Sequence, residues 1–65
     1  MREWLKELRE QNGLTQRQVS IECGVTENTI RNAEQGNTIE LNTALALSKL
    51  FNIPVERFAT DEDAS

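Results

Sequence analysis

The chain has 65 residues, of which 37% are hydrophobic and 28% charged, and its seven basic and eleven acidic residues give a formal net charge of −4. This length corresponds to one domain. A domain of this size buries only about 60% of the surface of its unfolded chain, so a second subunit would add stability. No stretch approaches the roughly 18 apolar residues of a membrane span, and an amphipathic pattern stands where a signal peptide would, so we expect a cytoplasmic protein.

The sequence offers little for catalysis or for metal binding. It has no histidine and a single cysteine, Cys23, so it supports neither a nucleophilic pair nor a metal site, and no internal disulfide can form. Its carboxylates are scattered, and so short a chain has little room for a cleft. We therefore expect no enzyme, no cofactor, no metal ion and no small-molecule ligand, and we interpret Cys23 as a small core residue.

The first predicted helix covers residues 2–11. Leu5 and Leu8 are three positions apart and are expected to face the core, with Trp4 flanking them. The pair Asn12-Gly13 is a typical helix end, because glycine enters the left-handed backbone region without steric cost.

Residues 15–35 have the spacing of two helices joined by a tight turn. Thr15 can cap the first of these helices, and Gln18, three residues later, can complete a capping box. Gly24 suits the turn that follows, and Thr26 is the next cap candidate. The pattern predicts a helix-turn-helix.

The second helix of this motif is expected to have one apolar and one polar face. Ile30 and Ala33, three positions apart, point inward, and the helix ends before Gly36. The opposite face carries groups that can pair with base edges, from Glu27, Asn28, Arg31 and Asn32. A solvated face without function is the alternative interpretation of these four residues.

A mostly buried helix is predicted near residues 40–51, after a loop at 36–39. Its inward face is expected to consist of apolar and small residues, namely Leu41, Ala44, Leu45, Ser48 and Phe51, widened by Leu47 and Leu50. A helix with so broad an apolar face has little surface left for solvent.

The last predicted helix is short. Pro54 cannot continue a helix but suits the first turn of a new one, so residues 54–59 are expected to form a helix that buries Val55 and Phe58. No strand is predicted, and the fold class is therefore all-α with five helices.

One domain is expected over residues 1–60, followed by an acidic, disordered tail at 61–65. The tail matters for electrostatics, because residues 1–60 carry eight acidic and seven basic groups and sum to −1. Sequence composition indicates no second domain.

Residues spread over nearly the whole chain match one pattern. They are Leu5, Leu8, Arg9, Leu14, Thr15, Gln16, Gly24, Val25, Thr26, Thr29, Ile30, Glu34, Gly36, Leu41, Leu45, Leu50 and Ile53. Through them the chain resembles the phage-repressor and Cro-type helix-turn-helix family of transcriptional regulators over residues 5–59. The resemblance implies a compact lambda-repressor-like domain whose second motif helix enters the major groove, with two-fold dimers reading operator half-sites.

The resemblance also implies a set of DNA contacts. Base contacts fall on the polar face of the second motif helix described above. The positions that match backbone-contacting residues of the family are Arg9, Gln16, Asn37 and Thr38. Arg9 also matches an arginine that pairs with the residue equivalent to Glu34, which would tie the first helix to the third.

Net charge argues against DNA binding, because duplex DNA repels a negative protein. However, Arg9, Arg17 and Arg31 lie on or near the helix-turn-helix, which leaves room for a local positive surface. Arg17 is therefore added to the expected phosphate contacts.

These observations favour a sequence-specific regulator that binds double-stranded DNA, acting as a repressor and as a homodimer on a palindromic operator. The dimer interface is expected at Ile53, Val55 and Phe58, although these three residues could instead belong to the core. The alternative function is a protein-interaction module that keeps the fold but has little affinity for DNA.

Overall fold

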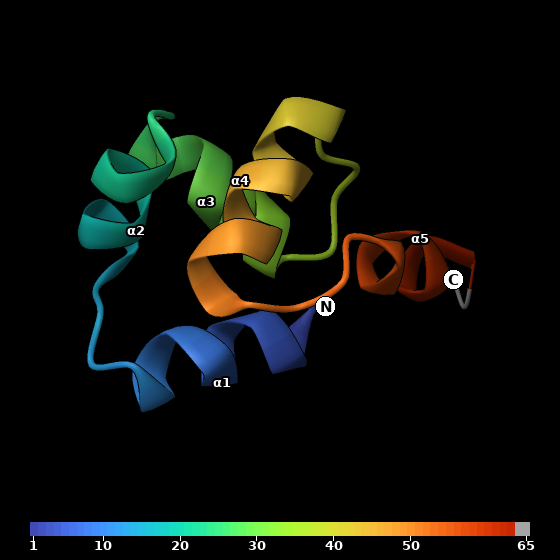
Figure 1. Cartoon of the computed structure of the whole chain (residues 1–65), viewed down its shortest axis with the longest axis horizontal. Helices are drawn as coiled ribbons and strands as arrows, with labels where there is room; N and C mark the ends of the chain where they lie inside the picture. The colour runs from blue at the N-terminus through green and yellow to red at the C-terminus, as the bar shows by residue number, and fades with distance from the viewer. Residues whose placement is uncertain (64–65) are drawn as a thin grey trace.

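The computed structural model describes the backbone of residues 1–63 and the side chains of residues 1–59. This part of the chain forms, in order, α1 (Glu3–Gln11), α2 (Gln16–Cys23), α3 (Glu27–Glu34), α4 (Leu41–Phe51) and α5 (Glu56–Asp63) (Figure 1). It contains no strand, so the predicted all-α fold with five helices is confirmed. None of the helices within residues 1–63 has the length and apolar character needed to cross a membrane.

The helix-turn-helix lies at the centre of the packing. Helix α2 packs against both α3 and α4, and α1 packs against α3. Figure 1 shows α1 along the lower edge of the molecule and α5 at the opposite end from α2. The two helices of the motif are thus supported by α4 on one side and by α1 on another.

The starts of α2 and α3 are set by the predicted caps. Thr15 Oγ1 accepts a hydrogen bond from the Gln18 backbone N–H at 3.1 Å, and Gln18 Oε1 accepts one from the Thr15 N–H at 2.8 Å, which completes the capping box. Thr26 Oγ1 accepts from the Thr29 N–H at 3.1 Å and caps α3. Gly24 ends α2 in the left-handed region at φ 71°. The predicted helix-turn-helix is therefore confirmed.

All five helices contribute to one apolar core. Its buried members are Leu5, Val19, Ile30, Ala33, Ala44, Leu47 and Phe58. Trp4 flanks this core as predicted, with its ring centroid 5.2 Å from that of Phe58. Leu8, which was predicted to face the core, is only half-buried and does not join the cluster.

The buried face of α4 differs from the predicted one. Leu47 is fully buried beside Thr43 and Ala44, whereas Leu41 is 68% exposed and Leu45 is 39% exposed. The prediction that Leu41 and Leu45 point inward was wrong. Helical spacing puts these two leucines on one face, but it does not say which face of an apolar helix its neighbours cover.

Arg2 is a fully buried charged residue that the sequence pattern did not reveal. Its Nη1 donates to the carbonyl oxygens of Ala33 at 2.6 Å and Asn37 at 3.2 Å, and its guanidinium lies 5.6 Å from the centre of the Phe58 ring. The cation therefore sits at the C-terminal end of α3, where free carbonyl groups and the helix dipole favour positive charge.

Helix α5 is shifted along the chain relative to the prediction. It was expected at 54–59 and instead begins at Glu56 and ends at Asp63. The backbone of the first three residues of the predicted tail is therefore helical. The remainder of that tail, residues 64 and 65, lies outside the described residues.

Candidate nucleic-acid interface

Helix α3 presents a polar face to solvent because its apolar face is buried in the core. Ile30 and Ala33 are buried on the inner side. The outer side carries the four predicted base-contacting residues, of which three are exposed and the last is half-buried: Glu27, Asn28, Arg31 and Asn32. The structure thus brings all four together on one accessible surface.

Most of these polar groups are available to an external partner. Within the described part of the chain, Glu27, Asn28 and Arg31 make no side-chain hydrogen bond or ion pair with another residue. Asn32 Oδ1 accepts a long hydrogen bond of 3.4 Å from Asn37 Nδ2. This face therefore offers amide, guanidinium and carboxylate groups that base edges can satisfy.

Glu34 lies at the other end of α3 and joins three helices. Arg9 Nε donates to Glu34 Oε2 at 2.5 Å and Arg9 Nη2 donates to Oε1 at 3.3 Å, so the predicted pair between α1 and α3 is confirmed. Gln16 Nε2, at the start of α2, donates to the same Oε1 at 3.2 Å. Arg9 Nη1 also donates to the Leu14 carbonyl oxygen at 2.9 Å. This network holds the first turn of α2 against the end of α3.

The network leaves Arg9 little accessible to an external phosphate group. Its side chain is only 12% exposed and that of Glu34 only 4%, so the positive charge of Arg9 is already paired inside the protein. Gln16 is half-buried and Arg17 is exposed in the first turn of α2. Because the backbone N–H groups of a first turn lack helical partners, this turn suits a phosphate oxygen better than the enclosed Arg9 does.

The loop after α3 carries the other two residues that were predicted to contact the phosphate backbone of DNA. Asn37 and Thr38 are both exposed there. The loop is held by the start of the chain, since Arg2 binds the Asn37 carbonyl oxygen. At Gly36, where φ is 93°, an added Cβ would lie 3.4 Å from the backbone of Met1. Glycine therefore allows the first residues to approach this loop closely.

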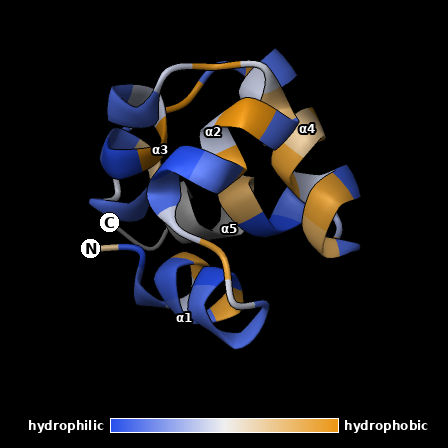
Figure 2. Cartoon of the chain, turned by 90° about the vertical axis from the view of Figure 1, so that its left-hand side faces the viewer, coloured by the Kyte–Doolittle hydropathy of each residue, from blue (hydrophilic) through white to orange (hydrophobic). Residues whose placement is uncertain are grey.

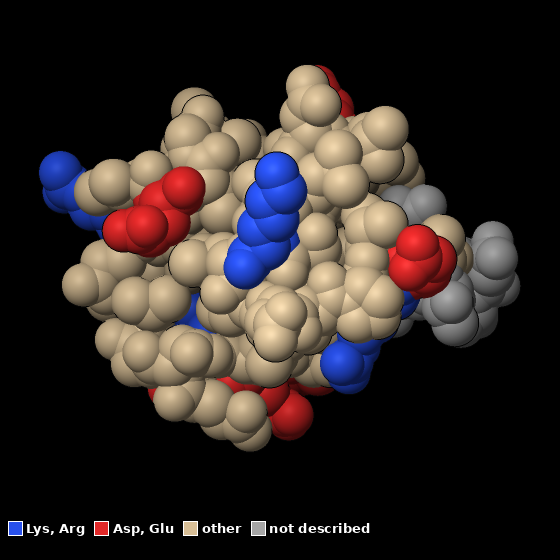
Figure 3. All heavy atoms as spheres, in the orientation of Figure 1, with Lys and Arg blue, Asp and Glu red and all other residues tan. Residues whose placement is uncertain are grey.

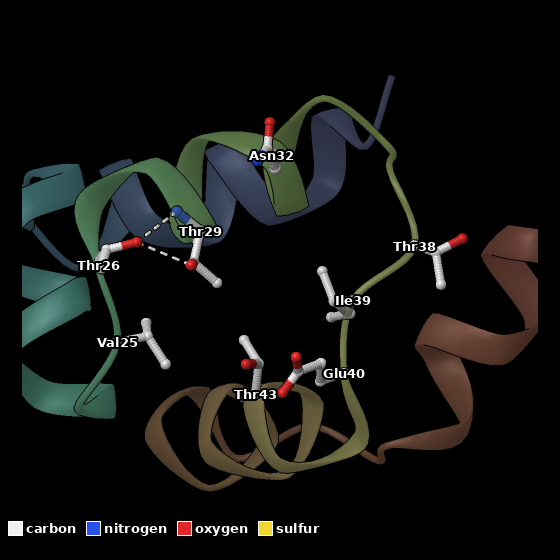
Figure 4. A pocket seen from close by; sticks show the side chains of 8 residues that line it. All are labelled: Val25, Thr26, Thr29, Asn32, Thr38, Ile39, Glu40 and Thr43. Atoms are coloured by element: carbon white, nitrogen blue, oxygen red, sulfur yellow. Dashed lines mark hydrogen bonds between the residues drawn. The ribbon is translucent and has the colours of Figure 1, made fainter.

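A hollow of about 380 Å³ separates α3 from the loop and from the start of α4 (Figure 4). Its walls are largely uncharged and come from Val25, Thr26, Thr29, Asn32, Thr38, Ile39, Glu40 and Thr43. Figure 4 shows the Thr26 and Thr29 hydroxyls facing each other at one end, 2.8 Å apart, while Asn32 points away from the hollow. The only charged lining residue is Glu40, so this hollow adds no cation to the surface beside α3.

Positive charge near α3 is consequently sparse. Arg17 and Arg31 are exposed, but Glu27 lies on the same surface as Arg31. Figure 3 shows the side of the molecule on which α4 lies in front, and there charged side chains lie apart from one another and form no continuous basic area. The electrostatic contribution to binding a polyanion is therefore modest.

Phe58 was expected either in the core or at a dimer interface, and the structure places it in the core. Its ring is 3% exposed because it packs between Trp4 and the guanidinium of Arg2. The other two predicted interface residues, Ile53 and Val55, are half-buried and pack against the core of their own chain.

Cys23 packs half-buried against the core at the end of α2. Burial raises the pKa of the Cys23 thiol above its ordinary value, and the carboxylate of Glu22 raises it further. The thiol is therefore protonated at neutral pH and is a poor nucleophile. In the part of the chain that the structure describes, no group of three histidine, cysteine, aspartate or glutamate side chains could hold a metal ion.

Comparison with known families identifies one match. A family model described as helix-turn-helix matches residues 5–58. The matched range begins at Leu5 in α1 and ends at Phe58 in α5, and both of these residues are buried in the core. Comparisons with curated proteins and with solved structures find no match.

Proposed function

Because the chain belongs to the Cro/C1-type helix-turn-helix family of DNA-binding transcription regulators, we propose that it is a sequence-specific repressor that binds a palindromic operator as a homodimer. The observation that carries the proposal is the outer face of α3, whose polar groups are accessible and largely without partners among the residues that the structure describes. Occupation of an operator that overlaps a promoter would exclude the polymerase. A cytoplasmic location is part of this proposal, because the protein acts where the DNA lies.

In this proposal α3 reads base edges in the major groove. Asn28 and Asn32 have the amide geometry that pairs with adenine. Glu27 can accept a hydrogen bond from the amino group of cytosine, and Arg31 can donate to guanine or to a phosphate. A homodimer would place two such helices about 34 Å apart, one turn of DNA, so that both enter the same side of the duplex.

The DNA backbone would be held beside α3. Gln16 and Arg17 supply side-chain donors at the start of α2, and Asn37 and Thr38 supply them in the loop after α3. Arg9 acts mainly through Glu34, whose carboxylate orients the Gln16 amide.

Replacing Asn28 by Ala is expected to weaken binding to the best operator by about 1–3 kcal/mol and to relax base preference at one position. The reason is that Asn28 is exposed on the outer face of α3 and its side chain has no hydrogen bond to any other described residue. Selection of bound duplexes from a random pool, followed by fluorescence anisotropy on the selected site, measures both effects. Gln35→Ala is the matched control, since Gln35 is exposed on the turn after α3 and outside the predicted contacts. Unaltered base preference in both Asn28→Ala and Asn32→Ala would contradict readout by α3.

Binding should weaken with salt, but less steeply than for a strongly basic protein. Two exposed arginines per subunit, Arg17 and Arg31, neutralise about four phosphates per dimer, which gives a logarithmic salt slope of roughly −4. A titration series on random-sequence duplex measures this slope, and Arg17→Gln should reduce its size by about 2 per dimer. Absence of binding to any duplex at low salt would instead favour the protein-interaction module.

A further inference from the structure

Among the residues whose side chains the structure describes, Arg2 is the only cation that is buried. Its backbone N–H donates to the Glu34 carbonyl oxygen at 2.9 Å, and its Nη1 donates to those of Ala33 at 2.6 Å and Asn37 at 3.2 Å. Figure 1 and Figure 2 both show the start of the chain next to one end of α3. Arg2 therefore joins the last turn of α3 to the loop that follows it.

We infer that Arg2 is a positioning residue for DNA binding, because it fixes the loop that presents Asn37 and Thr38 to the phosphate backbone. The inference rests on the proposed function, in which this loop contacts DNA, and it adds a residue that itself touches no DNA. Arg2 is fully enclosed, so its guanidinium cannot reach an external phosphate group. Its effect on DNA binding therefore passes through the loop.

The loop at 36–39 depends on Arg2 because it has few other attachments. Of the described residues outside α3, Arg2 alone makes a hydrogen bond to this loop. At the far end of the loop Ile39 packs against the core. Thr38 lies between these two attachments and makes no hydrogen bond with another described residue. The position of Thr38 is thus set by its neighbours, and Arg2 holds the neighbour on the α3 side.

Helix α5 keeps the Arg2 side chain in place. The guanidinium lies 5.6 Å from the centre of the Phe58 ring, and the Trp4 ring packs against Phe58 at 5.2 Å. A cation–π contact is strongest where water is excluded, and both Arg2 and Phe58 are buried. Through Arg2 the position of the loop therefore depends on α5, although α5 carries none of the predicted DNA contacts.

The test compares Arg2→Met with Arg57→Met on a selected operator and on random-sequence duplex. Both substitutions remove one positive charge, but Arg57 is exposed and stacks on the Trp4 ring instead of binding the loop. Arg2→Met is expected to raise both Kd values roughly tenfold, which equals the weakening of one hydrogen bond to DNA in each subunit. Base preference should stay the same, because phosphate contacts carry no sequence information. Arg57→Met should change neither Kd by more than about twofold, since an exposed charge away from the DNA is screened.

The salt dependence of binding separates positioning from direct contact. Arg2→Met should leave the logarithmic salt slope unchanged, because Arg2 neutralises no phosphate. A direct phosphate contact in each subunit would instead lower the size of the slope by about 2 per dimer.

A double-mutant cycle tests whether Arg2 acts through Thr38. Thr38→Ala should weaken binding in the wild-type chain and should have a much smaller effect in Arg2→Met, where the loop no longer presents Thr38 correctly. Gln16→Ala is the matched control, since Gln16 lies at the start of α2 and not in the loop. Its effect should be the same in both backgrounds. A role of Arg2 in overall stability alone would make the effects of Arg2→Met and Thr38→Ala additive.

Urea denaturation followed by circular dichroism gives the folded fraction of each variant, and each Kd is referred to folded protein. Where Arg2→Met does not fold, Phe58→Leu takes its place. This substitution removes the aromatic ring from the guanidinium but keeps an apolar side chain in the core and keeps the hydrogen-bond donors of Arg2. It should weaken binding in the same way, and the cycle with Thr38→Ala is repeated in it.

The outcomes separate this inference from the proposed function. A folded Arg2→Met variant with the wild-type Kd, additive effects with Thr38→Ala, or a reduced salt slope would each overturn the role of Arg2 and keep the proposed regulator. A wild-type chain that binds no duplex at low salt would overturn the proposed function, and the role of Arg2 with it. Tenfold weaker binding with unchanged base preference, unchanged salt slope and non-additivity with Thr38→Ala is the result expected.

Discussion

Replacing Glu34 by Ala is expected to destabilise the fold by about 3–5 kcal/mol, because it leaves the enclosed charge of Arg9 without its partner. The pair is nearly removed from solvent, and Glu34 also accepts a hydrogen bond from Gln16. The free energy of unfolding of a small domain starts at about 5 kcal/mol, so much of the population would unfold. Urea denaturation followed by circular dichroism measures the loss.

A double variant tests whether the stability lost in Glu34→Ala comes from the unpaired charge of Arg9. Arg9→Met combined with Glu34→Leu removes both charges and should recover a large part of the stability lost in Glu34→Ala, since no unpaired charge is then buried. A stability loss below about 1 kcal/mol in Glu34→Ala would instead mean that the pair contributes no more to stability than an exposed salt bridge. The network would then not be what holds α1 and α2 against α3.

Leu47→Ala should cost about 2–5 kcal/mol, the range for truncating a buried leucine. Leu47 is fully enclosed among core residues from the other helices, so its removal leaves a cavity. The midpoint of urea unfolding reports the change.

Two apolar truncations serve as controls for Leu47→Ala. Ile21 is 67% exposed, and Ile21→Ala should change stability by no more than about 0.5 kcal/mol. Leu8 is half-buried, so Leu8→Ala should cost less than Leu47→Ala. Equal losses at Leu47 and Ile21 would contradict the assigned core.

The helix-turn-helix could be predicted because its signals are local. The cap at Thr15 and its partner Gln18 are three residues apart, and the left-handed turn at Gly24 depends on one residue. The outward face of α3 followed from the spacing of Ile30 and Ala33, whose burial leaves the polar side exposed. The pairing of Arg9 with Glu34 came from family resemblance, since no short-range rule relates residues so far apart in the chain.

Other features needed the packed structure. Helix α4 has apolar residues on more than one side, and only its packing against the other helices decides that Leu47 is covered while Leu41 and Leu45 are not. For Phe58 the sequence left core and dimer interface open, and the structure encloses it with Trp4 and Arg2.

The amino-acid sequence by itself thus determined the helices, the turn and the polar outer face of α3, because capping, glycine conformations and helical spacing act over a few residues. Tertiary structure alone decided the burial of Arg2, the covered side of α4 and the choice between core and interface for Phe58. Each of these depends on which segments distant in the chain meet, and an amphipathic pattern shows that a face is apolar without showing what lies against it.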